Sequence, residues 1–444
     1  MKKQFCILAA AIAASLAGGS ALALSPAGPF AVQLTVSGSS AFEAALENEL
    51  SRAGSTICAA NSYNKFQSNT NDFRAYTCNL AANVVTPGGG ETAVIYYRGE
   101  GGSVVGLKPL LTTGPTILRL QLSSCTFVAP NNVLGSTGTN PCTTTTYNAV
   151  NDTAAGGLEK AVSQLGFADE EPTVFTGENY PTAATFNFLQ PALTGTERST
   201  LNNAAVAVVG QAFGIYVSSQ NTELSAVGNL SKTVLSNIFK GTYSDWNFVP
   251  TVGGGTVTTT TLPIKLCRRE AGSGTQVATS LFFNATNGFA STAVPGNLAA
   301  SSGGGGVQEN ASTGGMRTCL DGNAGAIGYI SSEVDQGTHK QIRIDGQGGA
   351  TGNNLGPLIA IGQYDYWYEM TAIKRPGLAG TANTLASKLI SVTQSQASGP
   401  VSPNIAFLSP FNAAQYPLVT PAGKQPVSCV RRSKVSTNVA LWQC

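Results

Sequence analysis

Apolar and polar residues follow one recurring pattern along this chain: an apolar strand, a turn rich in glycine and serine, and a helix. In VQLTVSGSSAFEAALENEL (residues 32–50) the first positions alternate as in a β-strand, and later apolar residues recur at helical spacing. The same order occurs in AVIYYRGEGGSVVGLKPLL (residues 93–111) and in TLPIKLCRREAGSGTQVATSLFF (residues 261–283). The pattern predicts three turns, each leading from a strand to the start of a helix.

Three further segments complete the predicted framework. AVAVVGQAFGIYVSS (residues 205–219) is typical of a long apolar strand interrupted by glycines. LSKTVLSNIFKGTYSDW (residues 230–246) has one apolar helical face and a stop signal at Lys240 and Gly241. YDYWYEMTAIKRP (residues 364–376) predicts a returning strand.

A helix start that follows glycine and serine is suited to bind a small anion. The N-terminus of a helix has unpaired N–H groups and about half a positive charge, and glycine lets the backbone approach the ligand. Serine and threonine are also ordinary N-caps, so each turn alone has a purely structural interpretation. Neither the G-x-x-x-x-G-K-[ST] nucleotide loop nor the G-x-S-x-G nucleophile elbow occurs in the sequence.

The composition favours a compact protein of two domains. Lys and Arg number 25 against 23 Asp and Glu, and 42% of the residues are hydrophobic. The nearly neutral balance argues against a nucleic-acid partner, which requires a basic face. The apolar content is sufficient for ordinary cores and argues against disorder.

The N-terminus predicts export. Lys2 and Lys3 precede an apolar run, and Ala21-Leu22-Ala23 forms a small-x-small cleavage site. We expect a signal peptide over residues 1–23 and a periplasmic or secreted mature protein. No later stretch has the roughly 18 to 20 uninterrupted apolar residues that a bilayer requires, so we expect no membrane insertion.

The cysteines predict disulfides. Eight remain after the signal peptide, an even number in an exported chain. Sequence alone leaves the connectivity open, and we favour pairing of neighbours in chain order: Cys58–Cys78, Cys125–Cys142, Cys267–Cys319 and Cys429–Cys444. Zinc is the competing interpretation, but no C-x-x-C spacing occurs and His339 is the single histidine. We therefore expect no metal and no cofactor.

Six segments in this order resemble the periplasmic phosphate-binding proteins of ABC transporters, a family within the two-domain solute-binding proteins. The matching segments are the Gly-Ser-Ser turn at residues 38–40, the Tyr-x-Gly-x-Gly-x-Ser turn at 97–103, Ala-Asp-x-x-Pro at 168–172, LSNIFKGTYSDW at 235–246, RREAGSGT at 268–275 and GAIGY at 325–329. The resemblance covers residues 32–330 and is looser over the last hundred residues.

The resemblance implies that the ligand is inorganic phosphate and places it on three turns. The implied ligand-binding residues are Ser39, Ser40, Ala41, Phe42, Ser103, Asp169, Arg269, Ser273, Gly274 and Thr275. Arg269 would clamp two oxygens with its guanidinium fork, with surface ion pairing as its alternative. Gly102 stands where a serine is usual, and Ala271 stands where many members have an aspartate that pairs with the arginine.

The presence of Asp169 among the implied site residues predicts that the site binds phosphate in preference to sulfate. Monohydrogen phosphate carries a proton that an ionised carboxylate can accept, whereas sulfate carries none and would face a like charge in a dry site. Two alternatives stay open: Glu170 is the acceptor, or Asp169, Glu170 and Glu171 form a solvated acidic cluster.

The resemblance also implies the architecture, an α/β fold of the two-domain periplasmic-binding-protein type (type II), in which crossing strands join the domains and the ligand lies between them. We place domain I at residues 24–210 and 364–444 and domain II at residues 211–363. A segment at about 111–151, with Cys125 and Cys142, is interpreted as a disulfide-pinned insertion in domain I.

Three functions of different classes are compatible with this sequence. The leading one is a monomeric binding protein that delivers phosphate to an ABC permease. The second keeps the fold without transport: a secreted or surface protein that binds phosphate or another oxyanion, or has an adhesive or matrix role. The third is an enzyme with a serine nucleophile, which we do not expect because a base is required and His339 is interpreted as an exposed loop residue.

Overall fold

The computed structural model describes most of the chain between residues 26 and 395. The described residues are 26, 28–40, 42–52, 54–69, 72–128, 140–144, 146–154, 156–283, 288–300, 304–331, 338–348, 355, 364–395, 430–431 and 442–443. The predicted signal peptide, Ala41 and the Cys429–Cys444 pair lie outside them. No helix in the described ranges is long and apolar enough to cross a membrane.

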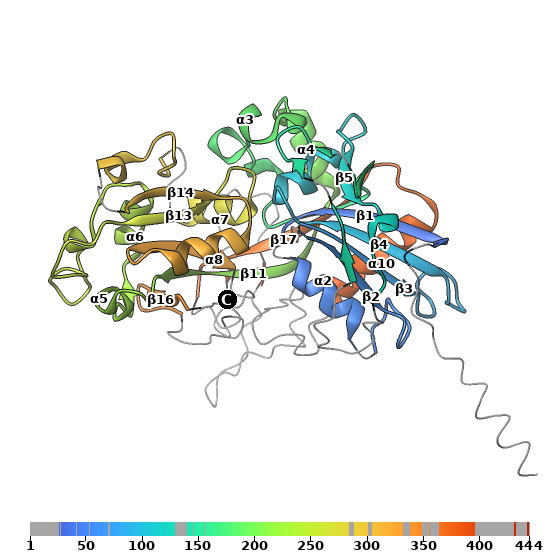
Figure 1. Ribbon diagram of the computed structural model, residues 1–444, viewed down its shortest axis with the longest axis horizontal. Helices are drawn as coiled ribbons and strands as arrows, with labels where there is room; N and C mark the ends of the chain where they lie inside the picture. The colour runs from blue at the N-terminus through green and yellow to red at the C-terminus, as the bar shows by residue number, and fades with distance from the viewer. Residues whose placement is uncertain are drawn as a thin grey trace, which may run out of the picture.

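The described chain forms two α/β lobes that lie side by side (Figure 1). The first lobe is built on the strands β1 (Val32–Gly38), β2 (Asn64–Ser68), β3 (Phe73–Asn79), β4 (Thr92–Arg98), β5 (Ile117–Leu120), β6 (Asn140–Cys142), β7 (Tyr147–Asn148), β8 (Thr153–Ala154), β9 (Leu158–Ala161) and β10 (Leu165–Ala168). Its helices are α2 (Phe42–Ser51), α3 (Ala183–Phe186), α4 (Gly195–Ala204) and α10 (Gly380–Ser395). In its sheet β1 pairs in parallel with both β4 and β10.

The second lobe has a smaller sheet covered by helices. Its strands are β12 (Asn229–Leu230), β13 (Lys265–Arg269), β14 (Gly306–Asn310), β15 (Ala326–Ser331) and β16 (Lys340–Ile344). Its helices are α5 (Thr222–Ser225), α6 (Lys232–Phe239), α7 (Gly274–Phe282) and α8 (Thr313–Gly322). The strand β13 lies between β14 and β15 and is parallel to both.

Two long strands, β11 (Ala205–Val217) and β17 (Trp367–Lys374), run between the lobes (Figure 1). The first part of β11 pairs antiparallel with β17, and its last residues pair with β15 and β16 of the second lobe. The strand β17 also pairs with β10 of the first lobe, so the sheet is continuous through both lobes. The boundaries at 210/211 and 363/364 stay predictions.

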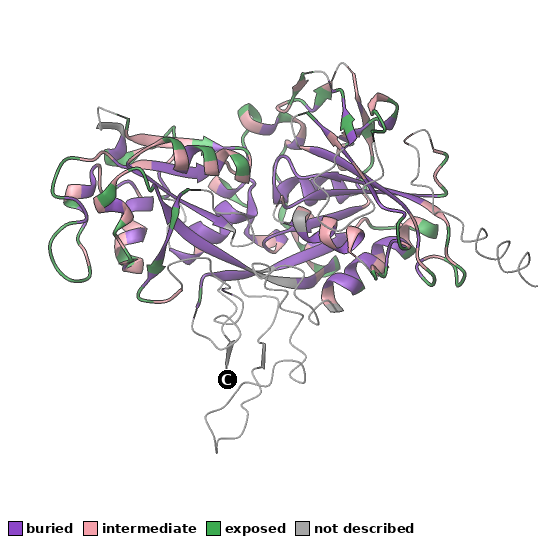
Figure 2. Ribbon diagram, turned by 60° about the horizontal axis from the view of Figure 1, so that its bottom comes forward, coloured by how far each residue is buried: buried purple, intermediate pink, exposed green. Residues whose placement is uncertain are grey.

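Each lobe has its own apolar core beneath the helices, and strands such as β1, β3, β4 and β10 are buried along most of their length (Figure 2). Local sequence signals set the helix starts: Thr194 and Glu197 form a capping box at α4, and Ser231 and Ser312 cap α6 and α8. These caps satisfy N–H groups that a helix start otherwise leaves without a partner.

The predicted framework is largely confirmed. The strand and helix expected in residues 32–50 are β1 and α2, and residues 205–219, 230–246 and 364–376 contain β11, α6 and β17. The second turn leads to a 3₁₀ helix at Ser103–Gly106 rather than to an α-helix.

The prediction of an exposed His339 is wrong. Its side chain is buried, and Nδ1 lies 2.9 Å from Oδ1 of Asp321. In sequence, the short run before β16 resembles a surface turn. In the structure, the imidazole ring of His339 packs edge-on against Tyr216 of β11.

Three of the four predicted disulfides are confirmed: Cys58–Cys78, Cys125–Cys142 and Cys267–Cys319. The second lies within the predicted insertion at about 111–151, whose strand β5 pairs antiparallel with β9 just beyond it. Buried residues of this insertion pack with β2, β3 and β4 in one apolar cluster.

Candidate anion-binding site

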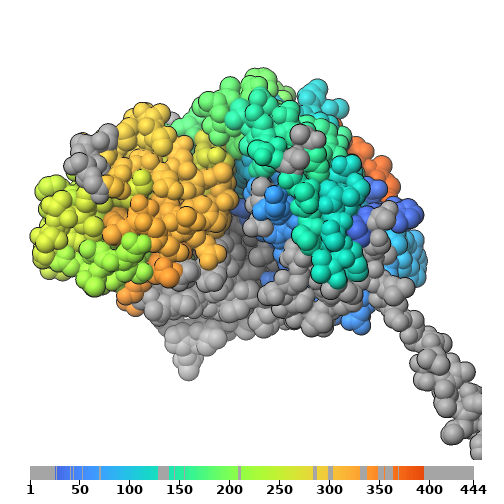
Figure 3. Space-filling model, viewed as in Figure 1, coloured from blue at the N-terminus to red at the C-terminus, as the bar shows by residue number. Residues whose placement is uncertain are grey.

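The turns predicted to bind an anion meet where the two lobes touch. The N–H of Val104 in the first lobe donates to the carbonyl of Gly272 in the second (3.0 Å), and the N–H of Gly272 donates to the carbonyl of Asn179 (3.1 Å). On the surface, a furrow runs between the two lobes on the face that Figure 3 shows. The predicted site residues therefore come from both sides of one interface.

Two glycines allow this close approach. A side chain at Gly102, whose φ is 67°, would place its Cβ 2.9 Å from the Cα of Ser273. At Gly274 a Cβ would lie 2.5 Å from the Cβ of Asp169 and still closer to Oγ of Ser103. The absence of a serine at position 102 thus has a physical reason, because the opposite turn occupies the space.

Asp169 lies at the centre of the interface. Its side chain is 3% exposed, and its Oδ1 accepts a hydrogen bond from the Ser39 hydroxyl. Oδ2 is 3.4 Å from the hydroxyl of Thr275, and the main-chain N–H donates to Oγ of Ser103 (3.0 Å). Groups from all three turns converge on this residue, since Thr275 belongs to α7 of the second lobe.

Burial raises the pKa of Asp169 above its ordinary value. Hydrogen bonds from Ser39, Thr275 and Ser103 and the positive charge of Arg269 oppose this rise. The net result is that the neutral form of this carboxyl group is favoured more than in an exposed aspartate.

The opening turn presents one hydroxyl to this centre. The N–H of Ser39 donates to the carbonyl of Phe167 (2.9 Å), and the N–H of Phe42 donates to the carbonyl of Ser39 (3.2 Å). The ring of Phe42 stacks on Phe167 with centroids 3.8 Å apart. Of this turn, the Ser39 side chain faces Asp169, Ser40 is half-buried, and Ala41 is not among the described residues.

The third turn brings the start of α7 to the same place. Ser273 occupies the N-cap position of α7 and makes no side-chain capping bond. Gly274 and Thr275 form the first positions of this helix, and all three residues are buried. The positive end of the helix dipole therefore points into the interface.

Arg269 ends β13 with a guanidinium that is held by main-chain carbonyls. Its side chain is 2% exposed, which excludes a surface ion pair. Nε donates to the carbonyl of Asn310 (3.1 Å) and Nη2 to that of Ala311 (3.0 Å). A guanidinium has five N–H donors, so these bonds leave two on Nη1 and one on Nη2.

The carbonyls take the place of the aspartate that the family pattern has at position 271. Ala271 offers no side-chain acceptor, and the two carbonyls that bind the guanidinium are neutral. Burial lowers the pKa of Arg269, and the negative charges of Glu270 and Asp169 oppose this fall. Its neighbour Glu270 is partly buried, and within the described part of the chain its Oε1 has no hydrogen-bond partner. Burial, opposed by Arg269 and reinforced by Glu100 and Glu309, raises the pKa of Glu270 to about 7.

One of the two alternatives for the acidic stretch disagrees with the geometry, and the other, Glu170 as the acceptor, stays a hypothesis. Asp169 and Glu170 are buried, so they do not form a solvated cluster. Among the described residues, Oε1 of Glu170 has no hydrogen-bond partner, and the serine and threonine hydroxyls reach Asp169 instead.

Sequence reasoning gave no role to Tyr97 or Asn310, and it considered Glu270 only as a substitute for the aspartate missing at position 271. The hydroxyl of Tyr97 donates to the carbonyl of Ser39 and so fixes the opening turn. Tyr97 is the first residue of the second turn motif, so its place in the motif could have indicated that it belongs to the site. The role of Asn310 rests on a main-chain carbonyl, for which the sequence carries no signal.

A family model described as a PBP superfamily domain matches residues 174–405, just over half of the chain. No curated protein sequence matches the chain.

Solved structures similar to the chain include three phosphate-binding proteins. A high affinity periplasmic phosphate-binding protein bound with phosphate is 17% identical, with 85% of this chain and 89% of that chain covered and a TM-score of 0.43. An ancestral soluble variant of the human phosphate binding protein is 16% identical, with 86% and 93% covered and a TM-score of 0.42. An ABC-type phosphate transport receptor from Vibrio cholerae is 18% identical, with 54% and 77% covered and a TM-score of 0.32.

Proposed function

The chain belongs to the PBP superfamily domain family, and from this premise we propose that it binds inorganic phosphate between its two lobes. Membership and the two-lobed α/β architecture confirm the predicted fold class. Family members are solute-binding proteins, which fits a site built from hydroxyl, amide and guanidinium donors.

The observation that carries the proposal is the convergence on Asp169. Hydroxyl groups from Ser39 in the first lobe and Thr275 in the second reach the same buried carboxylate. A ligand here meets donors on two sides, the start of α7 and the remaining N–H donors of Arg269. Such a set of donors is suited to a tetrahedral oxyanion and needs no metal.

Asp169 supports phosphate as the oxyanion. Monohydrogen phosphate has one P–O–H group that donates to a carboxylate, while its other oxygens accept from the surrounding donors. Sulfate offers no proton at neutral pH, so its oxygens would face the aspartate as like charges. The buried carboxylate thus selects for a protonated anion.

The biological role in our proposal is capture and delivery. The chain is exported, holds phosphate in the interlobe site, and passes it to an ABC permease without catalysing a reaction on it. The strands β11 and β17 join the lobes and supply the natural place for a hinge. This role is supported by the family and by the site's position at the interface.

Isothermal titration calorimetry on phosphate-stripped protein tests the proposal. We expect saturable phosphate binding with a stoichiometry of one and no heat with sulfate. Folded, stripped protein that gives no heat with phosphate contradicts the function. Equal affinity for sulfate would keep anion binding but contradict the role of Asp169.

A further inference from the structure

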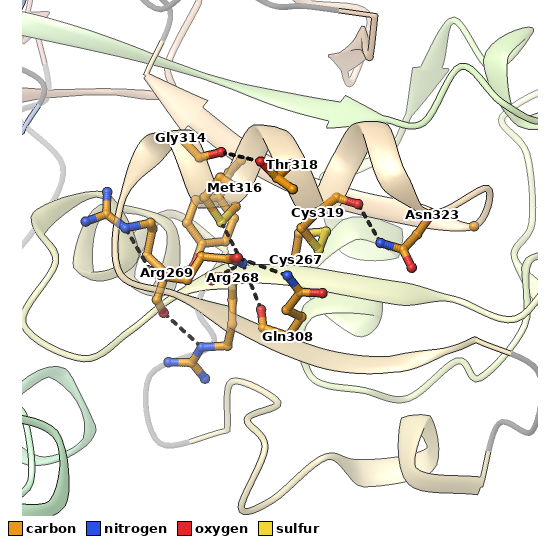
Figure 4. Close-up of a disulfide and its surroundings, with 12 residues drawn as sticks. Cys267, Arg268, Arg269, Gln308, Gly314, Met316, Thr318, Cys319 and Asn323 are labelled. Atoms are coloured by element: carbon orange, nitrogen blue, oxygen red, sulfur yellow. Dashed lines mark hydrogen bonds between the residues drawn. A yellow bond between two sulfur atoms is a disulfide. The ribbon is translucent and has the colours of Figure 1, made fainter. Parts of the chain in front are cut away.

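The Cys267–Cys319 disulfide lies on the same side of β13 as the arginine proposed to bind phosphate. Cys267 and Arg269 are two positions apart in this strand, so their side chains point to the same face. Cys319 belongs to α8, and the disulfide joins this helix to β13 (Figure 4). Arg268 between them donates instead to the carbonyl of Ala290 (2.8 Å).

The guanidinium of Arg269 contacts the corner that connects β14 to α8, residues 310–312. Its two acceptors, the carbonyls of Asn310 and Ala311, are main-chain groups. Their positions therefore depend on where β14 ends and where α8 begins. A shift of α8 relative to β13 would move the acceptors and turn the arginine.

Three attachments hold the 310–312 corner and α8 against β13, and a fourth bond fixes the start of α8 itself. Asn310 pairs with Arg269 in the β13–β14 ladder, and its Nδ2 donates to the carbonyl of Arg268 (3.0 Å). Ser312 caps α8 by accepting from the N–H of Gly315 (3.2 Å). The disulfide is the covalent attachment, and it lies further along the same helix.

We propose that the Cys267–Cys319 disulfide and Asn310 position the Arg269 guanidinium for anion binding. They fix α8 and the corner, so that two N–H donors stay on the carbonyls and the opposite edge of the fork faces the interface. This inference rests on the proposed binding of phosphate by Arg269. The two cysteines and Asn310 act through the arginine and do not touch the ligand.

The Cys58–Cys78 disulfide provides a matched control. It also pins buried elements of one lobe, and both of its cysteines lie in the apolar core around β3. It belongs to the first lobe, whereas Arg269 and its acceptors belong to the second. Removal of either disulfide costs stability, but only one of the two pairs contacts the strand that ends in Arg269.

The test is phosphate titration calorimetry on the full chain with C267S/C319S, C58S/C78S and N310A, each with Arg269 and with R269K. Lysine keeps the charge but loses the fork. With Arg269 present, we expect C267S/C319S to weaken phosphate binding about tenfold or more and N310A about threefold or more, while C58S/C78S stays within about twofold. In the R269K background, C267S/C319S and N310A should each weaken binding by less than about twofold.

The outcomes separate this inference from the proposed function. Wild-type protein that binds no phosphate overturns the function and the inference together. Binding by wild type that is unchanged in C267S/C319S and N310A overturns the inference alone. Equal losses in the Arg269 and R269K backgrounds mean that the disulfide acts on the whole lobe, and they also overturn it. If C267S/C319S does not fold, N310A decides with the disulfide intact.

Discussion

Ser39 and Asp169, which are 130 positions apart, are joined by a hydrogen bond from the serine hydroxyl to Oδ1 of the aspartate. The bond links the loop after β1 with the loop after β10, two neighbouring parallel strands. Loops at the carboxyl ends of adjacent parallel strands lie next to each other, which is where α/β proteins bind ligands. The site thus follows from strand order.

We predict that Asp169→Asn lowers phosphate affinity by about 10- to 100-fold, the range expected for loss of a charged hydrogen bond. The amide keeps the shape of the side chain but removes the negative charge, so sulfate binding should become measurable. Titration calorimetry with both anions checks this. Glu171→Gln, a neighbouring carboxylate outside the convergence on Asp169, is the control, and equal losses in both variants would contradict the role of Asp169.

Gly274→Ala should weaken phosphate binding by about tenfold or more, because the new methyl group would overlap Asp169 and Ser103. The backbone at this helical position accepts alanine, so the lobes are expected to separate rather than unfold. Gly314→Ala in α8 is the matched control, since its Cβ would lie an ordinary 3.6 Å from Ser312 Oγ. Small-angle scattering should show a larger radius of gyration for Gly274→Ala alone. Identical scattering and affinity in both variants would refute the close-approach argument.

Periodicity was sufficient to predict the elements that position the site. The apolar alternation of β1 and β11 and the helical faces of α2 and α6 were visible because burial on one face dictates each residue type. Three disulfides followed from chain order since each closes a local loop of 17 to 52 residues. These features depend on side chains close in sequence.

The contacts that orient the site were not predictable in the same way. Arg269 is held by carbonyls 41 and 42 positions away, and every residue type has a carbonyl. The burial of His339 depends on Tyr216 in a distant strand. Both are properties of tertiary packing, whereas local propensity describes neighbours along the chain.

The pKa of Glu270 predicts a pH-dependent stability. Its carboxyl titrates near 4.5 in the unfolded chain and at about 7 in the folded protein. Between these values the folded state binds more protons, so the free energy of unfolding should fall as pH rises from about 4.5 to 7, by about 1–3 kcal/mol from this residue.

Glu270→Gln should flatten this part of the profile, because the amide does not ionise. Chemical denaturation at several pH values measures the difference. Asp169, Glu170 and Glu100 also have raised pKa values, so some slope should remain in the variant. Parallel profiles for wild type and variant would show that Glu270 does not contribute.

Substitution of Asp152 should strongly lower the free energy of unfolding without affecting phosphate binding. Asp152 is fully buried, and its carboxylate contacts Arg98 Nη1 (2.5 Å), Lys160 Nζ (2.6 Å) and the N–H of Leu118 (3.0 Å). These bonds join β5, the turn between β7 and β8, and β9 to the end of β4. Asp152→Asn should lower the free energy of unfolding by about 3–5 kcal/mol, because it leaves the buried Arg98 with fewer partners.

Glu159→Gln is the control for Asp152→Asn, since this half-exposed glutamate pairs with Arg119 at 2.8 Å on the surface. Such a pair contributes about 0–1 kcal/mol, so its loss should hardly change the calorimetric melting temperature. Phosphate affinity, measured where both variants are folded, should match wild type because neither residue contacts the interlobe site. A melting temperature for Asp152→Asn equal to that of Glu159→Gln would mean that the insertion is held by its apolar cluster and the Cys125–Cys142 disulfide instead.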